Sequence, residues 1–167
     1  MGTKAVFFDR DGTLNVDVHY LHRPEDFHWI PGAQEAISYV KKLGYLAIVI
    51  TNQSGVARGF YPETDIVALH DWMNRELAKV GASLDDIFYC PHHPEGKIPQ
   101  YTKKCACRKP GTLLIDDACE RYDIDREGSF FVGDAVSDME CAKAAGVKGI
   151  RYTGGNLYEL LRQEIRQ

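Results

Sequence analysis

The stretch that decides the fold is AVFFDRDGTLN, residues 5–15. Four apolar residues, Ala5 to Phe8, form a run typical of a buried strand and lead directly into Asp9 and Asp11. Side chains alternate along a strand, so the two carboxylates point the same way if the extended geometry continues. Like charges this close repel unless a cation lies between them, and oxygen ligands suit Mg²⁺. The stretch therefore indicates a metal site, although in isolation an ordinary Asp-Gly turn is an equal alternative.

Length and composition limit the possibilities. The chain has 167 residues, 44% of them hydrophobic, which fits a single domain over residues 1–167. A net charge of -4 with interspersed signs gives no block that would bind nucleic acid. No apolar stretch approaches the roughly 20 residues of a membrane span, and the N-terminal apolar run is too short for a signal peptide, so we expect a cytoplasmic protein. Three of the five cysteines lie within Cys90 to Cys107 and the count is odd, and in a reducing compartment such clustering favours metal binding over disulfides.

Apolar runs alternate with amphipathic stretches, which is typical of an α/β fold around a central parallel sheet. The pattern predicts strands at 5–8, 45–50, 86–89, 129–132 and 147–152, and helices at 33–43, 63–80, 112–121, 137–145 and 156–165. Gly44, Gly81 and Gly146 stand where helices are expected to end. Two segments, 15–29 and 90–110, fit neither period, and such long loops usually carry function.

Ligands of an open parallel sheet bind at the carboxyl ends of its strands. Polar residues follow the expected strands here: Thr51-Asn52-Gln53-Ser54-Gly55 after the second, and Gly133-Asp134 after the fourth. Arg108 and Lys109 precede Pro110 before a helix, although surface charge is the ordinary explanation of such a pair. Asp138 has two open interpretations, an outer partner of the site or a favourable charge in the first turn of a helix.

Four motifs together carry a family resemblance. In order they are FFDRDGTLN, VITNQSG, CRKPG and FVGDAVSDM, and they resemble the motifs of the haloacid dehalogenase (HAD) superfamily of phosphatases. The chain further resembles the bacterial subfamily of heptose bisphosphate and histidinol phosphate phosphatases, through NQSGVARG at 52–59, YCPHHP at 89–94 and CACRKP at 105–110. The resemblance implies a three-layer, Rossmann-like fold and hydrolysis of a phosphate monoester.

The chemistry of phosphoryl transfer and the resemblance assign the same roles. Asp9 is the candidate nucleophile that forms an aspartyl-phosphate, and Asp11 is the general acid and base. Thr51 and Lys109 stabilise the transferring phosphoryl group. Mg²⁺ is expected on Asp9, Asp134 and the backbone carbonyl of Asp11.

The subfamily pattern also implies the substrate contacts and the substrate. The matching positions are Asp17, Val18, His19, Tyr20, Asn52, Gln53, Ser54 and Arg108. The implied substrate is a small phosphorylated metabolite, foremost D-glycero-D-manno-heptose 1,7-bisphosphate losing its 7-phosphate, with histidinol phosphate as the alternative. Ala135 stands where heptose bisphosphate enzymes often have lysine, which weakens the heptose match. A phosphate-receiver domain and a zinc-stabilised binding module without turnover are alternatives of another class.

The loop after the third expected strand predicts a zinc site. Cys90-Pro-His92 and Cys105-Ala-Cys107 supply three thiolates and one imidazole, a set that suits a tetrahedral, structural Zn²⁺. His93 is the rival fourth ligand, and unrelated buried cysteines are the alternative explanation. Cys119 and Cys141 fall inside expected helices and are interpreted as core residues.

The spacing of the elements leaves no room for a separate cap domain. Only a loop and one helix lie between Asp11 and the second expected strand at Tyr45, and one helix precedes the zinc loop. We therefore expect an open active site shielded by the 15–29 segment and the zinc loop. A monomer would suffice for such a site.

Overall fold

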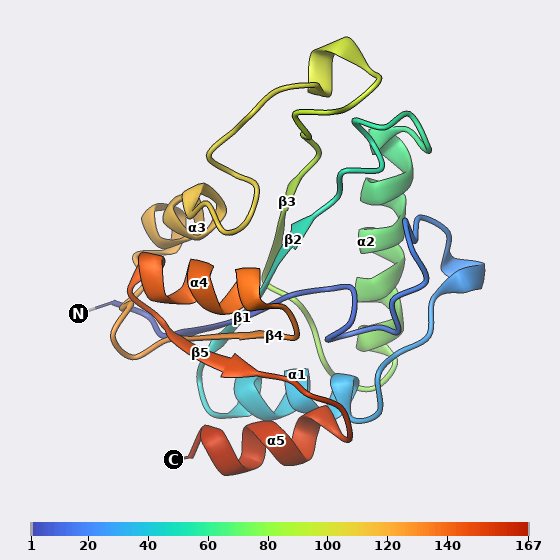
Figure 1. Cartoon of the computed structure of the whole chain (residues 1–167). Helices are drawn as coiled ribbons and strands as arrows, with labels where there is room; N and C mark the ends of the chain where they lie inside the picture. The colour runs from blue at the N-terminus through green and yellow to red at the C-terminus, as the bar shows by residue number, and fades with distance from the viewer. Residues whose placement is uncertain (1, 167) are drawn as a thin grey trace.

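A five-stranded parallel sheet organises the molecule, and the computed structural model describes residues 2–166. The strands are β1 (Ala5–Phe8), β2 (Leu46–Asn52), β3 (Asp86–Cys90), β4 (Phe130–Gly133) and β5 (Lys148–Arg151). Their order across the sheet is β3-β2-β1-β4-β5, which puts β1 in the centre (Figure 1). The expected α/β architecture is confirmed, and the order also places the chain reversal between β1 and β4, where open sheets bind ligands.

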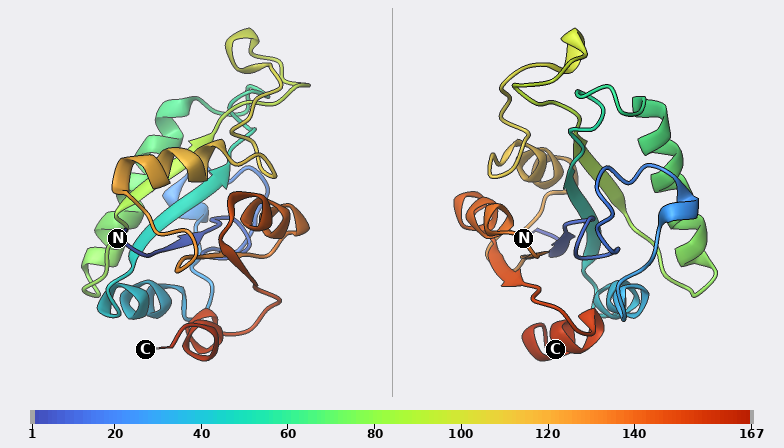
Figure 2. Two further views of the ribbon diagram at one scale, coloured as in Figure 1. Left: turned by 90° about the vertical axis from the view of Figure 1, so that its left-hand side faces the viewer. Right: turned by 45° about the vertical axis from the view of Figure 1, so that its right-hand side comes forward.

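Helices cover both faces of this sheet and complete three layers (Figure 2). They are α1 (Ala33–Lys42), α2 (Glu63–Ala78), α3 (Leu113–Tyr122), α4 (Val136–Ala145) and α5 (Leu157–Glu164). One core cluster joins the sheet to α1, α2 and α5, and a second joins it to α3 and α4. Gly146 ends α4 in the left-handed conformation with φ +78°, as the sequence predicts.

The strand sequences explain why both faces are covered. Val6 and Phe8 of β1 belong to one core cluster, whereas Ala5 and Phe7 belong to the other. All four are fully buried. A strand buried on both faces reads as a continuous apolar run rather than an alternating one, which is the pattern that opens this chain.

The main difference from the expected elements lies at the end of the second strand. We predicted that this strand ends at residue 50, but β2 continues to Asn52. Thr51 and Asn52 pair with Tyr89 and Cys90 of β3, so backbone pairing overrides their polar character. The other element boundaries differ by two residues or fewer. The two long loops contain short 3₁₀ turns, at Pro24–Asp26 and Pro99–Tyr101.

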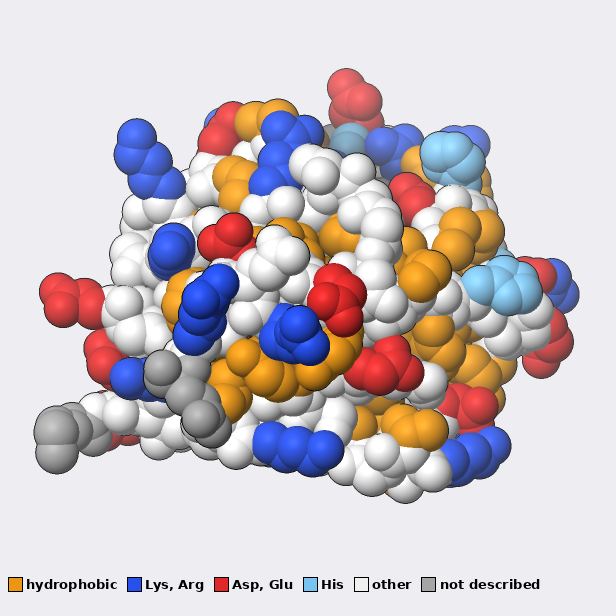
Figure 3. Space-filling view, turned by 90° about the horizontal axis from the view of Figure 1, so that it is seen from below, with side chains coloured by type: hydrophobic (Ala, Val, Ile, Leu, Met, Phe, Trp, Pro, Cys, Tyr) orange, Lys and Arg blue, Asp and Glu red, His pale blue; other side chains and the backbone are white. Residues whose placement is uncertain are grey.

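The long connecting segments contain no further α-helix or strand in the part of the chain that the structure describes. Between β1 and α1, and between β3 and α3, residues 2–166 form only loops and the two 3₁₀ turns. Acidic and basic side chains are intermingled on the face seen from below in Figure 3. Among the described helices, none has the length and apolar character needed to cross a membrane.

Candidate active site

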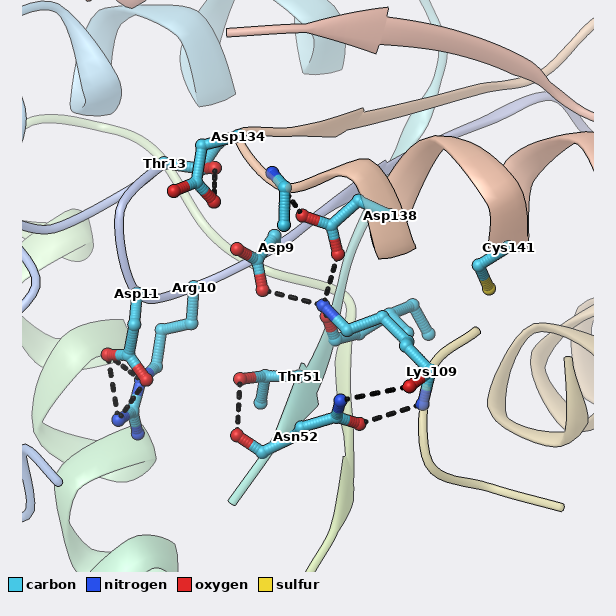
Figure 4. A network of polar contacts seen from close by, with 12 residues as sticks. Asp9, Arg10, Asp11, Thr13, Thr51, Asn52, Lys109, Asp134, Asp138 and Cys141 are labelled. Carbon is cyan, nitrogen blue, oxygen red and sulfur yellow. Dashed lines mark hydrogen bonds and ion pairs between the residues drawn. The ribbon is translucent and has the colours of Figure 1, made fainter. Parts of the chain in front are cut away.

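The site forms where β1, β2 and β4 end and the loop before α3 returns to the sheet. Asp9 and Asp11 follow β1, Thr51 is the second-to-last residue of β2, and Asp134 follows β4. Lys109 reaches them from the loop that precedes α3 (Figure 4). These are the residues for which the sequence predicts catalytic or magnesium-binding roles, and the fold brings all five to one edge of the sheet.

Local backbone geometry lets Asp9 and Asp134 approach. The Asp9 N–H donates to the Val132 carbonyl (2.9 Å), which extends the β1–β4 pairing by one residue. Gly12 then turns the chain with φ +88°, and a Cβ atom at this position would overlap the Asp134 carboxylate. Thr13 Oγ1 lies 3.5 Å from Asp134 Oδ1. The Asp11-Gly12 turn is therefore present, and it leaves the space that the Asp134 carboxylate occupies.

Lys109 lies between two buried carboxylates. Its Nζ is 2.7 Å from Asp9 Oδ1 and 2.6 Å from Asp138 Oδ1, and all three side chains are at most 10% exposed. Burial disfavours the ammonium ion, but the two acidic neighbours outweigh it and raise the pKa of Lys109. Burial raises the pKa of Asp9 to about 8 against the attraction of Lys109, and Asp138 adds to the increase. The carboxylates outnumber the cation that they share.

The acidic cluster suits a small divalent ion. Asp9, Asp134 and Asp138 each offer a carboxylate oxygen, and these oxygens lie within 4.8 Å of one another. Oxygen donors of this kind and a surplus of negative charge are the preferences of Mg²⁺. Asp9 and Asp134 are the two side-chain ligands that the sequence predicts. The Asp11 carboxylate lies outside this cluster, which agrees with its expected contribution through the backbone carbonyl alone.

The structure shows which groups Asp138 contacts, a point on which the sequence left two interpretations open. It is 1% exposed, and its second oxygen accepts a hydrogen bond from the Ala135 N–H (3.1 Å), which caps the start of α4. Its first oxygen binds Lys109. Asp138 therefore satisfies both proposed interpretations, a helix charge and a partner of the site, because α4 begins directly beside Lys109.

The last two residues of β2 and the residue after it form hydrogen bonds that support the site. Thr51 Oγ1 accepts a hydrogen bond from Gln53 Nε2 (2.9 Å), and both side chains are buried. Asn52 Oδ1 accepts from the Lys109 backbone N–H (2.9 Å), and Asn52 Nδ2 lies 3.5 Å from the Lys109 carbonyl. We expect Asn52 and Gln53 to contact substrate, and both line a hollow beside the site. Their amide groups also form hydrogen bonds within the site, Asn52 with the Lys109 backbone and Gln53 with Thr51 and Asp11.

Two adjoining hollows open beside these residues. The first, of about 220 Å³, is lined by Asp9, Thr51, Lys109, Asp134 and neighbours, and the second, of about 240 Å³, by Asp17, His19, Tyr20, Ser54 and neighbours. Asp11 lines both. The first hollow thus holds the residues expected to act in phosphoryl transfer, and the second gathers most of the expected substrate contacts.

Two predicted substrate residues lie elsewhere. Val18 is 40% exposed and faces a separate hollow on the outer side of the 15–29 segment. Arg108 lines neither of the two site hollows, and its Nη1 is buried without a hydrogen-bond partner among the described residues.

The predicted zinc ligands converge in the 90–107 loop. Ligand atoms of Cys90, His92, Cys105 and Cys107 lie within 4.8 Å of one another. The Cys107 sulfur is 2.7 Å from that of Cys90 and 3.2 Å from His92 Nδ1. All of these cysteines are free thiols, and burial raises the pKa of Cys90. Three thiols and an imidazole around one centre fit a tetrahedral ion that would remove their protons.

His93, the rival ligand, faces another direction. Its Nε2 lies 3.1 Å from Arg58 Nη2, and its Nδ1 accepts from the Glu95 N–H (3.0 Å). The loop tip is held by Glu63, whose carboxylate accepts hydrogen bonds from the Tyr89 and Tyr101 hydroxyls. The cluster therefore uses His92, and the loop that carries it is tied to the start of α2.

Comparisons with known proteins agree with this geometry. Residues 106–164 match the HAD-hydrolase-like family model. The chain is 45% identical over 161 residues to D-glycero-beta-D-manno-heptose-1,7-bisphosphate 7-phosphatase of Rhodopseudomonas palustris, covering 96% of this chain and 89% of that one. Its identity to the protein of the same name from Photorhabdus laumondii is 46%, covering 92% and 82%.

A solved structure supports the same conclusion. The D,D-heptose 1,7-bisphosphate phosphatase from B. bronchiseptica, complexed with magnesium and phosphate, superposes with a TM-score of 0.81 at 36% identity, covering 96% of this chain and 86% of that one. The resemblance found in the four motifs is confirmed along nearly the whole chain. The chain therefore belongs to the family of HAD-type phosphatases, hydrolases of phosphoric monoesters, that contains these heptose bisphosphate phosphatases.

Proposed function

We propose that this protein is a Mg²⁺-dependent phosphatase that removes the 7-phosphate of D-glycero-D-manno-heptose 1,7-bisphosphate through an aspartyl-phosphate. The observation that carries the proposal is the placement of Asp9 against Lys109 at 2.7 Å inside an acidic cluster, in a chain 45% identical to a heptose bisphosphate phosphatase. The names of the relatives reported above, all heptose bisphosphate phosphatases, favour heptose over histidinol phosphate, despite Ala135.

The first chemical step follows from the positions of the side chains. A carboxylate oxygen of Asp9 attacks phosphorus, and the bond from phosphorus to the sugar oxygen breaks with its electron pair. Asp11, which lines both hollows, donates its proton to the leaving oxygen. Thr51 donates a hydrogen bond and Lys109 supplies positive charge to the phosphoryl oxygens, which carry the developing charge.

The second step returns the enzyme to its starting state. A water molecule attacks the phosphorus of the aspartyl-phosphate, Asp11 accepts the proton of that water, and Asp9 leaves as a carboxylate. Asp138 keeps Lys109 directed at the site throughout, because its carboxylate binds the lysine Nζ at 2.6 Å at the start of α4 (Figure 4).

Two metal ions complete the proposal. Asp9, Asp134 and the Asp11 carbonyl would hold Mg²⁺, which when bound neutralises phosphate charge and reduces its repulsion by the carboxylates. Cys90, His92, Cys105 and Cys107 would hold a structural Zn²⁺. Because Cys107 stands two residues before Lys109, fixing the cysteine loop also fixes the segment that carries this lysine.

The test measures phosphate release with added Mg²⁺ from the α and β anomers of heptose 1,7-bisphosphate and from histidinol phosphate. Phosphorus NMR identifies which phosphate leaves. We expect the 7-phosphate to be released and histidinol phosphate to be a poor substrate; the reverse preference would reject the substrate assignment.

A pair of variants tests the nucleophile. Asp9→Asn is expected to reduce turnover on the order of 10³-fold or more. Asp117→Asn, an exposed aspartate on α3, serves as the matched control and is expected to leave turnover unchanged. Unchanged phosphate release by Asp9→Asn would remove Asp9 from the mechanism.

A further inference from the structure

A buried arginine, Arg10, contacts Asp11, the residue proposed as the general acid. Arg10 stands between Asp9 and Asp11, and its side chain is 0% exposed. Its Nε donates to Asp11 Oδ1 and its Nη2 to Asp11 Oδ2, both at 3.0 Å. Burying a cation is costly unless its N–H groups find partners, so a side chain placed this way is held by specific contacts.

Three separate parts of the chain supply those contacts. Nη2 also donates to the Leu21 carbonyl (3.0 Å) in the 15–29 segment and lies 3.2 Å from Gln53 Oε1 after β2. Nη1 lies 3.2 Å from Nε2 of His70 on α2. Burial, together with the charge of Arg10, lowers the pKa of His70 to about 3, so this imidazole stays neutral and can accept through Nε2. Arg10 is therefore fixed from three directions.

The Asp11 carboxylate is held by this network at a definite place. Each carboxylate oxygen accepts two hydrogen bonds, one from the Arg10 guanidinium and one from a side-chain amide. The amide donor to Oδ1 is Asn15 (3.1 Å), and the amide donor to Oδ2 is Gln53 (3.2 Å). The planar guanidinium fork fixes the plane of a carboxylate, which a single amide donor does not do. Asp11 lies where the phosphoryl hollow meets the second hollow, which is where the scissile oxygen of a substrate spanning both would lie.

We propose that Arg10 is a positioning residue: it holds the Asp11 carboxylate at the junction of the two hollows for proton transfer to the leaving oxygen, and His70 anchors Arg10 from α2. The inference rests on the proposed role of Asp11 as acid. Arg10 itself touches no reacting atom and acts only through Asp11, so its loss affects the steps in which Asp11 moves a proton.

This role predicts a dependence on the leaving group. When the bond from phosphorus to an alkyl oxygen breaks, the oxygen takes the electron pair and needs the proton of Asp11. A nitrophenolate ion is stable without that proton. A misdirected Asp11 therefore slows cleavage of sugar phosphates much more than cleavage of p-nitrophenyl phosphate, whereas general damage to the site slows both.

The experiment compares kcat/KM for the two kinds of substrate, because this ratio excludes the later hydrolysis of the aspartyl-phosphate. Arg10→Met is expected to lose about 10²-fold on heptose bisphosphate and less than about fivefold on p-nitrophenyl phosphate. Asp11→Asn sets the reference pattern. Arg121→Met, which replaces an arginine 60% exposed on α3, is the matched control and is expected to change neither value.

A second variant keeps the test decisive if Arg10→Met does not fold. His70→Phe preserves the fork on Asp11 but removes its anchor, and we expect the same selective loss at about tenfold. Equal losses on both substrates, or no loss on either, in a folded variant would overturn the proposal. Wild-type protein that cleaves simple alkyl phosphates but not heptose bisphosphate would reject the substrate assignment only, and the Arg10 comparison would then use the alkyl phosphate.

Discussion

Replacing Lys109 by methionine removes a cation held between Asp9 and Asp138. The ammonium lies 2.7 Å and 2.6 Å from their oxygens, and the three side chains are 4%, 10% and 1% exposed. Methionine has a similar length and is expected to fill the same space, so the change removes charge with little loss of volume. It leaves the carboxyl groups of Asp9 and Asp138 without their shared cation where water reaches them poorly.

The expected cost follows from burial. Breaking a buried ion pair by removing one partner costs about 3–5 kcal/mol of unfolding free energy, because the remaining charge is left without compensation. Lys41 and Asp85 provide a matched control, since their atoms are also 2.7 Å apart but their side chains are 28% and 23% exposed. Lys41→Met is expected to cost only about 0–1 kcal/mol, as is usual for ion pairs near the surface.

Urea unfolding at neutral pH in magnesium-free buffer measures both costs. Adding Asp138→Asn to Lys109→Met is expected to recover about 1–2 kcal/mol, because it removes a buried carboxylate that has lost its cation. Saturating Mg²⁺ is expected to recover stability as well, since it binds only the folded acidic cluster. Equal costs for Lys109→Met and Lys41→Met, or no recovery in the double variant, would refute the reasoning from burial.

Three further changes test other parts of the structure. Gly12→Ala is expected to destabilise the protein by about 1 kcal/mol or more and to weaken Mg²⁺ binding, because φ is +88° and the new Cβ would overlap the Asp134 carboxylate; calorimetric titration checks the binding. Cys105→Ser is expected to lose the bound zinc in metal analysis while Cys119→Ser retains it, and retention by both would contradict the proposed ligand set. Glu63→Gln is expected to speed hydrogen exchange in residues 96–104, because it weakens the acceptor that ties the loop tip to α2, and exchange equal to wild type would show that the loop is held by other contacts.

Much of the fold is readable from the order of residues. The unbroken apolar run of Ala5 to Phe8 predicts a strand covered on both faces, and Gly146 ends a helix where expected. The boundary of β2 was predicted less well, because Thr51 and Asn52 have polar side chains that resemble a turn. Their place in the strand depends on pairing with β3, a contact more than 30 residues away that local pattern does not contain.

The candidate catalytic residues show a similar division between what the sequence indicates and what only the fold shows. Asp9 and Asp11 are identifiable in sequence because carboxylates at the end of a buried strand are unusual without a ligand, whereas Lys109 is identified through the CRKPG motif in which it stands. The sequence did not show that Asp138 binds Lys109 or that Arg10 binds Asp11. An aspartate in the first turn of a helix and a charged residue between two acids both have ordinary explanations.

The sequence by itself thus determined the kind of chemistry, through residue types whose spacing along the chain is characteristic: the strand that ends in two aspartates and the cysteine pairs of the metal loop. Only the tertiary structure decided which groups hold those residues in place. It joined Arg10 to His70 across 60 positions and Lys109 to Asp9 across 100. Such contacts arise from the packing of helices on the sheet, and burial decides their strength, because removing water is what makes an ion pair or a fixed carboxylate costly to disturb.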